Sequence, residues 1–126
     1  MAVPETVAAF TRDRFRSLED LQVLVVCMEY AGRWWDPADL AQHLGIARAA
    51  AHRSLEHLTR HNLFDIRVTG SVRYRFSPGT TELASDAAAW IAEYRRDPIA
   101  VVKLATASRT LSDFADAFRI KRHDDR

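Results

Sequence analysis

Residues 39–64 read DLAQHLGIARAAAHRSLEHLTRHNLF, and this stretch decides the fold of the 126-residue chain. A helical pattern over 37–44 ends at Gly45, a residue that closes helices in a left-handed conformation. A second helical pattern follows over about 47–62 after a tight turn. The stretch therefore predicts a helix-turn-helix.

The helix expected over 47–62 has two dissimilar faces. Its inward positions are Ala51, Leu55 and Leu58, spaced four and three residues apart like the buried stripe of an amphipathic helix. The opposite face projects away from the core and carries Arg48, Ala49, His52, Arg53, Glu56 and Arg60. We therefore expect this helix to turn a mostly cationic face outward.

After this helix the pattern changes to an alternation of apolar and polar residues. The alternation runs on both sides of Gly70 and Ser71 and predicts a β-hairpin over about 64–77. The hairpin face expected to be turned to the domain consists of Ile66, Val68, Val72, Tyr74 and Phe76. The opposite face is expected to hold Arg67, Arg73 and Arg75.

Helical patterns flank this core on both sides. They are predicted over 4–15, 18–31, 80–96, 99–106 and from about 110 to 118. The order of elements is that of a winged helix-turn-helix, mainly α with a small β-hairpin and additional C-terminal helices. We expect four parts: an N-terminal extension (1–16), the winged helix-turn-helix domain (17–78), C-terminal helices that form a homodimer interface (79–119) and a charged tail (120–126).

The quoted stretch resembles the core of bacterial transcription regulators of the MarR type. In that family an "LA..L.I" helix precedes a recognition helix ending in "L...GLV" and then a basic wing; here DLAQHLGI is followed by ARAAAHRSLEHLTRHNLF. The resemblance covers about residues 18–78. It implies a regulator that binds double-stranded DNA.

Carried over by position, the resemblance assigns DNA contacts to two groups of residues. The positions that touch base edges in the major groove hold Arg48, Ala49, His52 and Arg53, and the wing positions that meet the backbone or minor groove hold Arg67, Thr69, Ser71 and Arg73. An α-helix fits the major groove and Arg can donate two parallel hydrogen bonds to guanine, whereas backbone contacts add affinity with little sequence information. We expect both groups to point the same way, as one convex cationic surface.

The sequence also departs from the family pattern. Ala47 stands where these families commonly carry a Ser or Thr cap, and Ala49 to Ala51 offer no side-chain hydrogen bonds, which indicates modest sequence specificity. The family's long N-terminal dimerisation helix has no clear counterpart before residue 18. A homodimer must therefore use other surfaces. The C-terminal helices carry more apolar positions than the core of the domain requires, so we expect the homodimer interface there.

Charge is concentrated in the middle of the chain, although the formal net charge is only +1. Residues 48–75 hold six arginines and two acidic residues, whereas residues 1–47 hold four basic and seven acidic residues. A compact cationic segment in a nearly neutral chain is typical of a module that touches a polyanion with one face. The alternative is a solvated charged face, which for the wing arginines would keep an edge hairpin from pairing with other chains.

Other kinds of chemistry find little support. There is no Gly-rich phosphate loop, nucleophile elbow or carboxylate pair, so we expect neither an enzyme nor a cofactor. His57, His61 and Asp65 lack the further Cys or His residues that would complete a metal site, which favours solvated histidines. Cys27 lies in an apolar run of six residues, 23–28, which favours a packed thiol and is too short to cross a membrane. We expect a cytoplasmic protein.

Two other functions fit the same fold. In the first, the protein is an interaction adaptor that presents its basic face, or Trp34 and Trp35, to an acidic partner. At most one of these consecutive tryptophans can pack fully inward. In the second, a pocket between the wing and the C-terminal helices senses a small molecule, but no residue specifies the ligand.

Overall fold

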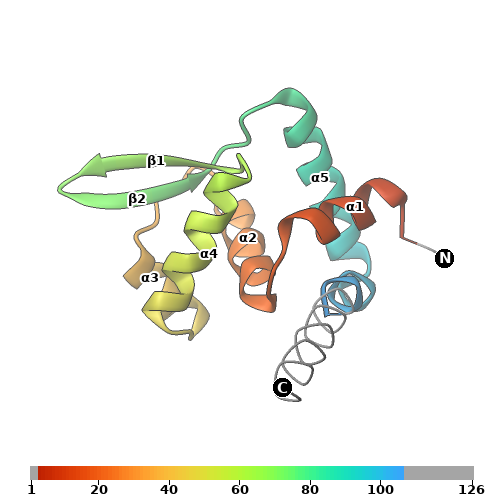
Figure 1. Ribbon diagram of the computed structural model, residues 1–126, viewed down its shortest axis with the longest axis horizontal. Coiled ribbons are helices and arrows are strands. Elements are labelled where there is room, and N and C mark those ends of the chain that lie inside the picture. Colours follow the sequence, from red (N-terminus) through yellow and green to blue (C-terminus); the bar gives the residue numbers. More distant parts are fainter. Residues whose placement is uncertain (1–2, 107–126) are drawn as a thin grey trace, which may run out of the picture.

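The computed structural model describes residues 3–106, and it is a winged helix-turn-helix. Its labelled elements are α1 (Glu5–Arg14), α2 (Leu18–Glu29), α3 (Pro37–Leu44), α4 (Arg48–Arg60), β1 (Phe64–Thr69), β2 (Ser71–Phe76) and α5 (Thr81–Arg96), and residues 98–106 are also helical. The hairpin projects from one side of the helical body, and α1 and α5 lie on the other (Figure 1). The predicted fold class is confirmed, whereas the helix expected from about residue 110 lies outside the described residues.

Local signals set the helix boundaries within two residues of those predicted. The side chains of Ser17, Asp36 and Thr80 each accept a hydrogen bond from a backbone N–H three residues later, and so they cap α2, α3 and α5. Gly45 ends α3 with φ 70°, and Asn62 follows α4 with φ 64°. As expected, Ala47 gives α4 no side-chain cap.

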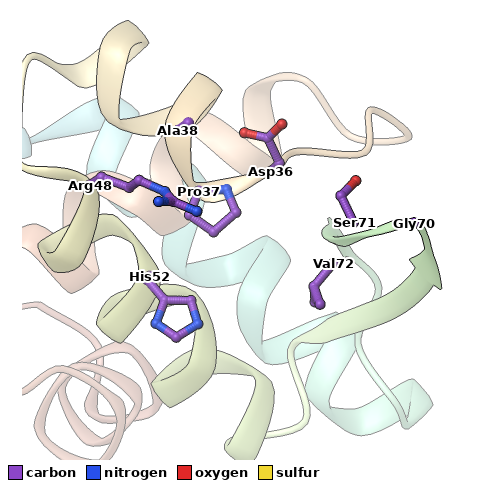
Figure 2. Close-up of a pocket in the computed structure, with 8 residues that line it drawn as sticks. All are labelled: Asp36, Pro37, Ala38, Arg48, His52, Gly70, Ser71 and Val72. Atoms are coloured by element: carbon purple, nitrogen blue, oxygen red, sulfur yellow. The ribbon is translucent and has the colours of Figure 1, made fainter.

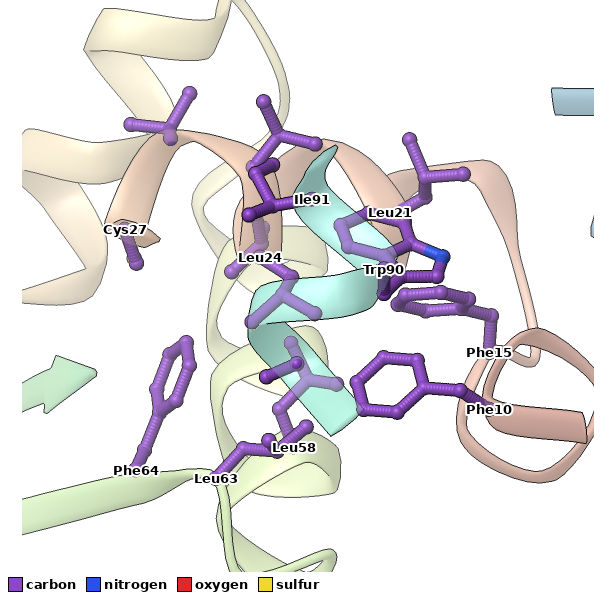
Figure 3. Close-up of a cluster of buried hydrophobic side chains, with 14 of the residues drawn as sticks. Phe10, Phe15, Leu21, Leu24, Cys27, Leu58, Leu63, Phe64, Trp90 and Ile91 are labelled. Carbon is purple, nitrogen blue, oxygen red and sulfur yellow. The ribbon is translucent and has the colours of Figure 1, made fainter. Parts of the chain in front are cut away.

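The core is one continuous cluster that joins the helix-turn-helix to α1 and α5 (Figure 3). The Trp90 ring lies 5.7 Å from Phe10 and 5.1 Å from Phe15, and its Nε1 donates a hydrogen bond to Thr11 Oγ1 at 3.1 Å. The N-terminal segment is thus packed onto α5 rather than lying free. Cys27 is buried as predicted, and burial raises the pKa of its thiol to about 12.

The hairpin has the predicted alternation but not the predicted burial. Val68 pairs with Val72 and Phe64 with Phe76 across the two strands, around a turn in which Gly70 has φ 83°. Tyr74 is buried, but Ile66, Val68 and Val72 are 44%, 71% and 40% exposed. These three residues lie on the face that turns toward α4, as expected, but the domain does not bury them, because the hairpin extends beyond the helices and only its base reaches the core (Figure 1).

The segment before α3 fastens this base to the body. Trp35 and Tyr74 exchange two backbone hydrogen bonds of 2.8 Å, so residue 35 adds a bridge along the free edge of β2. Trp35 is buried and Trp34 is half-buried, as expected for consecutive residues in extended chain. None of the helices within residues 3–106 combines the length and apolarity that crossing a bilayer requires.

Candidate nucleic-acid interface

The outer face of α4 carries all four residues predicted to touch bases. Arg48, Ala49, His52 and Arg53 are exposed. His52 Nε2 lies 3.5 Å from Glu56 Oε2, one helical turn away. Within the described part of the chain, no carboxylate lies within ion-pair distance of Arg48 or Arg53. The two guanidinium groups are therefore uncompensated positive charges on a solvent-facing helix.

A cleft of about 390 Å³ separates α4 from the hairpin tip (Figure 2). Arg48 and His52 lie on its α4 side, and residues 70–72 lie on its hairpin side. The beginning of α3 closes one end, with the carboxylate of Asp36 among the lining groups. The structure thus brings Arg48, His52 and Ser71 to one cleft and adds an acidic residue that sequence reasoning did not include.

The wing arginines lie on the other face of the hairpin. Arg67 and Arg73 are cross-strand partners, and side chains alternate between the faces, so both point away from the face that carries Val72. Figure 2 shows the side chains of Ser71 and Val72 pointing in opposite directions, with Val72 on the cleft side. The expected single convex surface was therefore wrong: a cleft divides it, and an apolar hairpin face is turned toward α4.

The remaining predicted wing residues lie near the tip. Thr69 and Ser71 are cross-strand partners on either side of Gly70, and both are exposed. Arg73 is also exposed. Arg67 is exposed but in contact: its guanidinium lies 4.6 Å from the centre of the Trp34 ring. The contact between Arg67 and Trp34 was not predicted from the sequence. The only signal for it was the alternation of side chains in extended chain: because Trp35 is buried, Trp34 points to the opposite side, where Arg67 lies.

Buried polar contacts fix α4 against the preceding helices. The carboxylate of Asp20, which is fully buried, accepts a hydrogen bond of 2.6 Å from the Ser54 hydroxyl and one of 2.9 Å from the backbone N–H of Arg16. Because a buried carboxylate without partners is strongly unfavourable, this set of bonds favours one position of α4 on α2. The exposed face of α4 is therefore held in a defined orientation.

His57 belongs to this buried junction, and its prediction as a solvated histidine was wrong. It is 8% exposed, and its Nε2 donates a 2.7 Å hydrogen bond to the backbone carbonyl of Arg14. The half-buried His61 ring lies 4.5 Å from it. Burial and, second, the neighbouring His57 lower the pKa of His61. Residues 3–106 contain no group of three or more His, Cys, Asp or Glu residues able to hold a metal ion.

Comparisons with known proteins match the fold. No protein-family model and no curated protein matches the sequence. Among solved structures, RV1404 from Mycobacterium tuberculosis is similar with a TM-score of 0.50 and 17% identity, over 88% of this chain and 81% of that one. ZitR from Lactococcus lactis gives a TM-score of 0.42 at 18% identity, over 79% of this chain and 72% of that one. The adhesin competence repressor AdcR from Streptococcus pyogenes gives a TM-score of 0.46 at 14% identity, over 90% of each chain. At 17% identity, the likeness to RV1404 is one of fold.

Proposed function

We propose that this protein is a DNA-binding transcription regulator that inserts α4 into the major groove of double-stranded DNA. The observation that carries the proposal is the outer face of α4, where Arg48 and Arg53 are exposed and uncompensated on a helix whose other face is anchored in the core. A rigid helix with free guanidinium groups has the shape and the hydrogen-bond donors that major-groove recognition requires.

Each residue on this face has a distinct role in the proposal. Arg48 lies in the first turn of α4 and Arg53 lies near its middle, and each can donate two hydrogen bonds to a guanine. His52 offers one further donor, while Ala49 allows close approach and an apolar contact with a thymine methyl group. Few hydrogen-bonding side chains read bases here, so modest sequence specificity follows.

The cleft beside α4 suits one sugar–phosphate strand. The major and minor grooves are separated by such a strand, so a helix in the first groove and a hairpin over the second have the strand between them. Arg48 and His52 line the α4 side of the cleft. Ser71 points to the other face of the hairpin, so Arg67, Thr69, Ser71 and Arg73 provide the proposed backbone contacts along the hairpin.

The proposal also covers the parts of the chain outside this surface. In this proposal residues 17–78 are the DNA-binding domain, and residues 79–119 join two copies of the chain as a MarR-like homodimer. Residues 1–16 are an N-terminal extension, and residues 120–126 are a charged tail. No enzymatic activity and no cofactor is proposed, and the protein acts in the cytoplasm. A homodimer would present two copies of α4 to two half-sites on one face of a duplex.

A salt titration of binding to a labelled random duplex, followed by fluorescence anisotropy, tests the proposal. Affinity should fall log-linearly with salt concentration, because each neutralised phosphate releases a counterion. On a duplex selected from the random pool for tight binding, Arg48→Ala should weaken binding about tenfold, since a bidentate contact to a base contributes about 1–3 kcal/mol. Arg95→Ala is the matched control, because Arg95 is exposed on α5, outside the proposed surface. An unchanged anisotropy of the wild-type mixture at low salt would refute DNA binding.

The second candidate function is a protein-interaction adaptor, favoured by the exposed apolar face of the hairpin. Ile66, Val68 and Val72 share that face and are not covered by the described part of the chain. Such residues are typical of protein contacts. Two results together would favour the adaptor function over the regulator function. The protein would not bind duplex DNA, and Val68→Asp would abolish its capture of a defined acidic partner.

A further inference from the structure

Two arginines of the hairpin share one tryptophan ring. The guanidinium carbons of Arg67 on β1 and Arg75 on β2 lie 4.6 Å and 4.4 Å from the centre of the Trp34 ring. Both arginines belong to the hairpin face opposite the cleft with α4. The set of Trp34, Arg67 and Arg75, here called the arginine platform, thus gathers two cations from different strands at one place.

The backbone around Trp34 is fixed independently of this stacking. The next residue, Trp35, is buried and exchanges two 2.8 Å backbone hydrogen bonds with Tyr74 on β2. Because successive side chains in extended chain point to opposite sides, a buried Trp35 turns Trp34 toward the arginine face. The indole is therefore a support built into the fold.

Stacking on an indole leaves a guanidinium able to bind anions. The ring attracts the cation through its face, whereas the N–H donors of the guanidinium lie in its own plane and point past the ring. The indole also restricts both side chains before any ligand arrives, which reduces the entropy lost on binding. Two adjacent planar forks of donors are well suited to phosphate oxygens.

The charges of the platform are only weakly compensated. No carboxylate within residues 3–106 forms an ion pair with Arg67. Arg75 Nη2 lies 3.7 Å from Asp65 Oδ2, but both side chains are partly open to solvent, and exposed pairs of this kind contribute little. A phosphate can replace Asp65 as the partner of Arg75. Arg73, the cross-strand partner of Arg67, adds a third positive charge to the same face.

We infer that the arginine platform binds phosphate groups of the DNA backbone, on the strand opposite the one that lies in the cleft. This inference rests on the proposed function. A hairpin over the minor groove has one backbone strand on each side. The cleft side of the hairpin faces the strand next to α4, so the platform faces the other strand. Arg75 and Trp34 are thereby added to the predicted interface, Arg75 as a phosphate contact and Trp34 as a positioning residue.

Variants of the platform test this inference in duplex-binding titrations. Arg75→Ala should weaken binding about three- to tenfold and make the slope of log affinity against log salt shallower by about 1, the value for one phosphate contact. Trp34→Ala should weaken binding similarly, and Trp34→Phe should restore most of it because a phenyl ring also supports a guanidinium. Arg95→Ala should leave affinity and slope unchanged. Circular dichroism and thermal unfolding check that each variant is folded.

Tryptophan fluorescence gives a second readout that a merely structural Trp34 would not change. Trp35 and Trp90 are 1% and 0% exposed, so quenching by iodide reports mainly on Trp34. Duplex DNA should protect Trp34 from iodide, whereas inorganic phosphate at the same phosphate concentration should not. Protection by inorganic phosphate and not by duplex would overturn the assignment to the DNA backbone.

The outcomes also separate this inference from the proposed function. If Arg48→Ala weakens duplex binding but Arg75→Ala and Trp34→Ala do not, the platform is refuted and the DNA-binding function stands. If the platform variants weaken binding and Arg48→Ala does not, the hairpin binds DNA without base contacts by α4, and the proposed function fails. If the wild-type protein binds no duplex, both fail.

Discussion

Helix α4 buries Leu55 and Leu58 completely, whereas the hairpin across the cleft leaves Val68 71% exposed. The helix is held by a core stripe and by the buried carboxylate of Asp20. Beyond its base, the hairpin is held by its own ladder and by surface stacking on Trp34. The two sides of the candidate interface therefore depend on different forces. Changes behind α4 should alter the stability of the protein, and changes on the hairpin should alter binding alone.

The largest expected difference is one of stability between two truncations. Leu58→Ala removes a fully buried side chain and leaves a cavity, so the free energy of unfolding should fall by about 3 kcal/mol. Val68→Ala removes exposed atoms and should change it by less than about 0.5 kcal/mol. Urea denaturation followed by circular dichroism measures both. Equal losses in the free energy of unfolding would mean that the hairpin belongs to the cooperative core, and the two sides of the interface would then not differ in what holds them.

The same contrast explains how much of the fold and site could be predicted from the sequence. The two faces of α4 could be predicted because helical spacing and core burial follow from residues close together in the chain. In the hairpin, alternation indicates which residues share a face. It does not indicate whether any other element covers that face, and Val68 lies on the expected face but is exposed for this reason.

The partners of other site residues lie too far away in the chain for a local pattern to indicate them. His57 contacts the carbonyl of Arg14, 43 residues earlier, and nothing in its own helix distinguishes it from a solvated histidine. Asp36 caps α3 through a residue only three positions later, but its place in the cleft depends on the position of the hairpin tip. Tertiary packing decides such contacts, and a single sequence does not contain them explicitly.

The next, smaller effect is a change in duplex affinity, and it is expected at Asp36, which lines the cleft between α4 and the hairpin. Its carboxylate lines the cleft proposed for a phosphate strand and should repel it. Asp36→Asn removes the negative charge, and Asn caps helices about as well as Asp does, so α3 should remain intact. Duplex affinity should rise roughly threefold at low salt, with a smaller gain as salt increases.

Asp39→Asn is the matched control for this change. It removes the same charge from the same helix, but Asp39 does not line the cleft. Anisotropy titrations at two salt concentrations compare the variants, with thermal unfolding as the check on α3. Similar gains for both substitutions would reflect net charge alone, and the backbone strand would then not lie beside Asp36.

The smallest effect concerns pH and belongs to the anchored side alone. The pKa of His61 is lowered in the folded protein, chiefly by burial and then by His57, so at mildly acidic pH the unfolded chain binds more protons than the folded one. Stability should therefore fall as pH decreases through the ordinary histidine pKa of about 6.5 toward the lower folded value. His61→Gln should remove part of this loss, and only a small part because the ring is half-buried. Urea midpoints at about pH 7.5 and 5.5 measure the difference. A pH dependence identical in wild type and variant would show that His61 does not contribute to it.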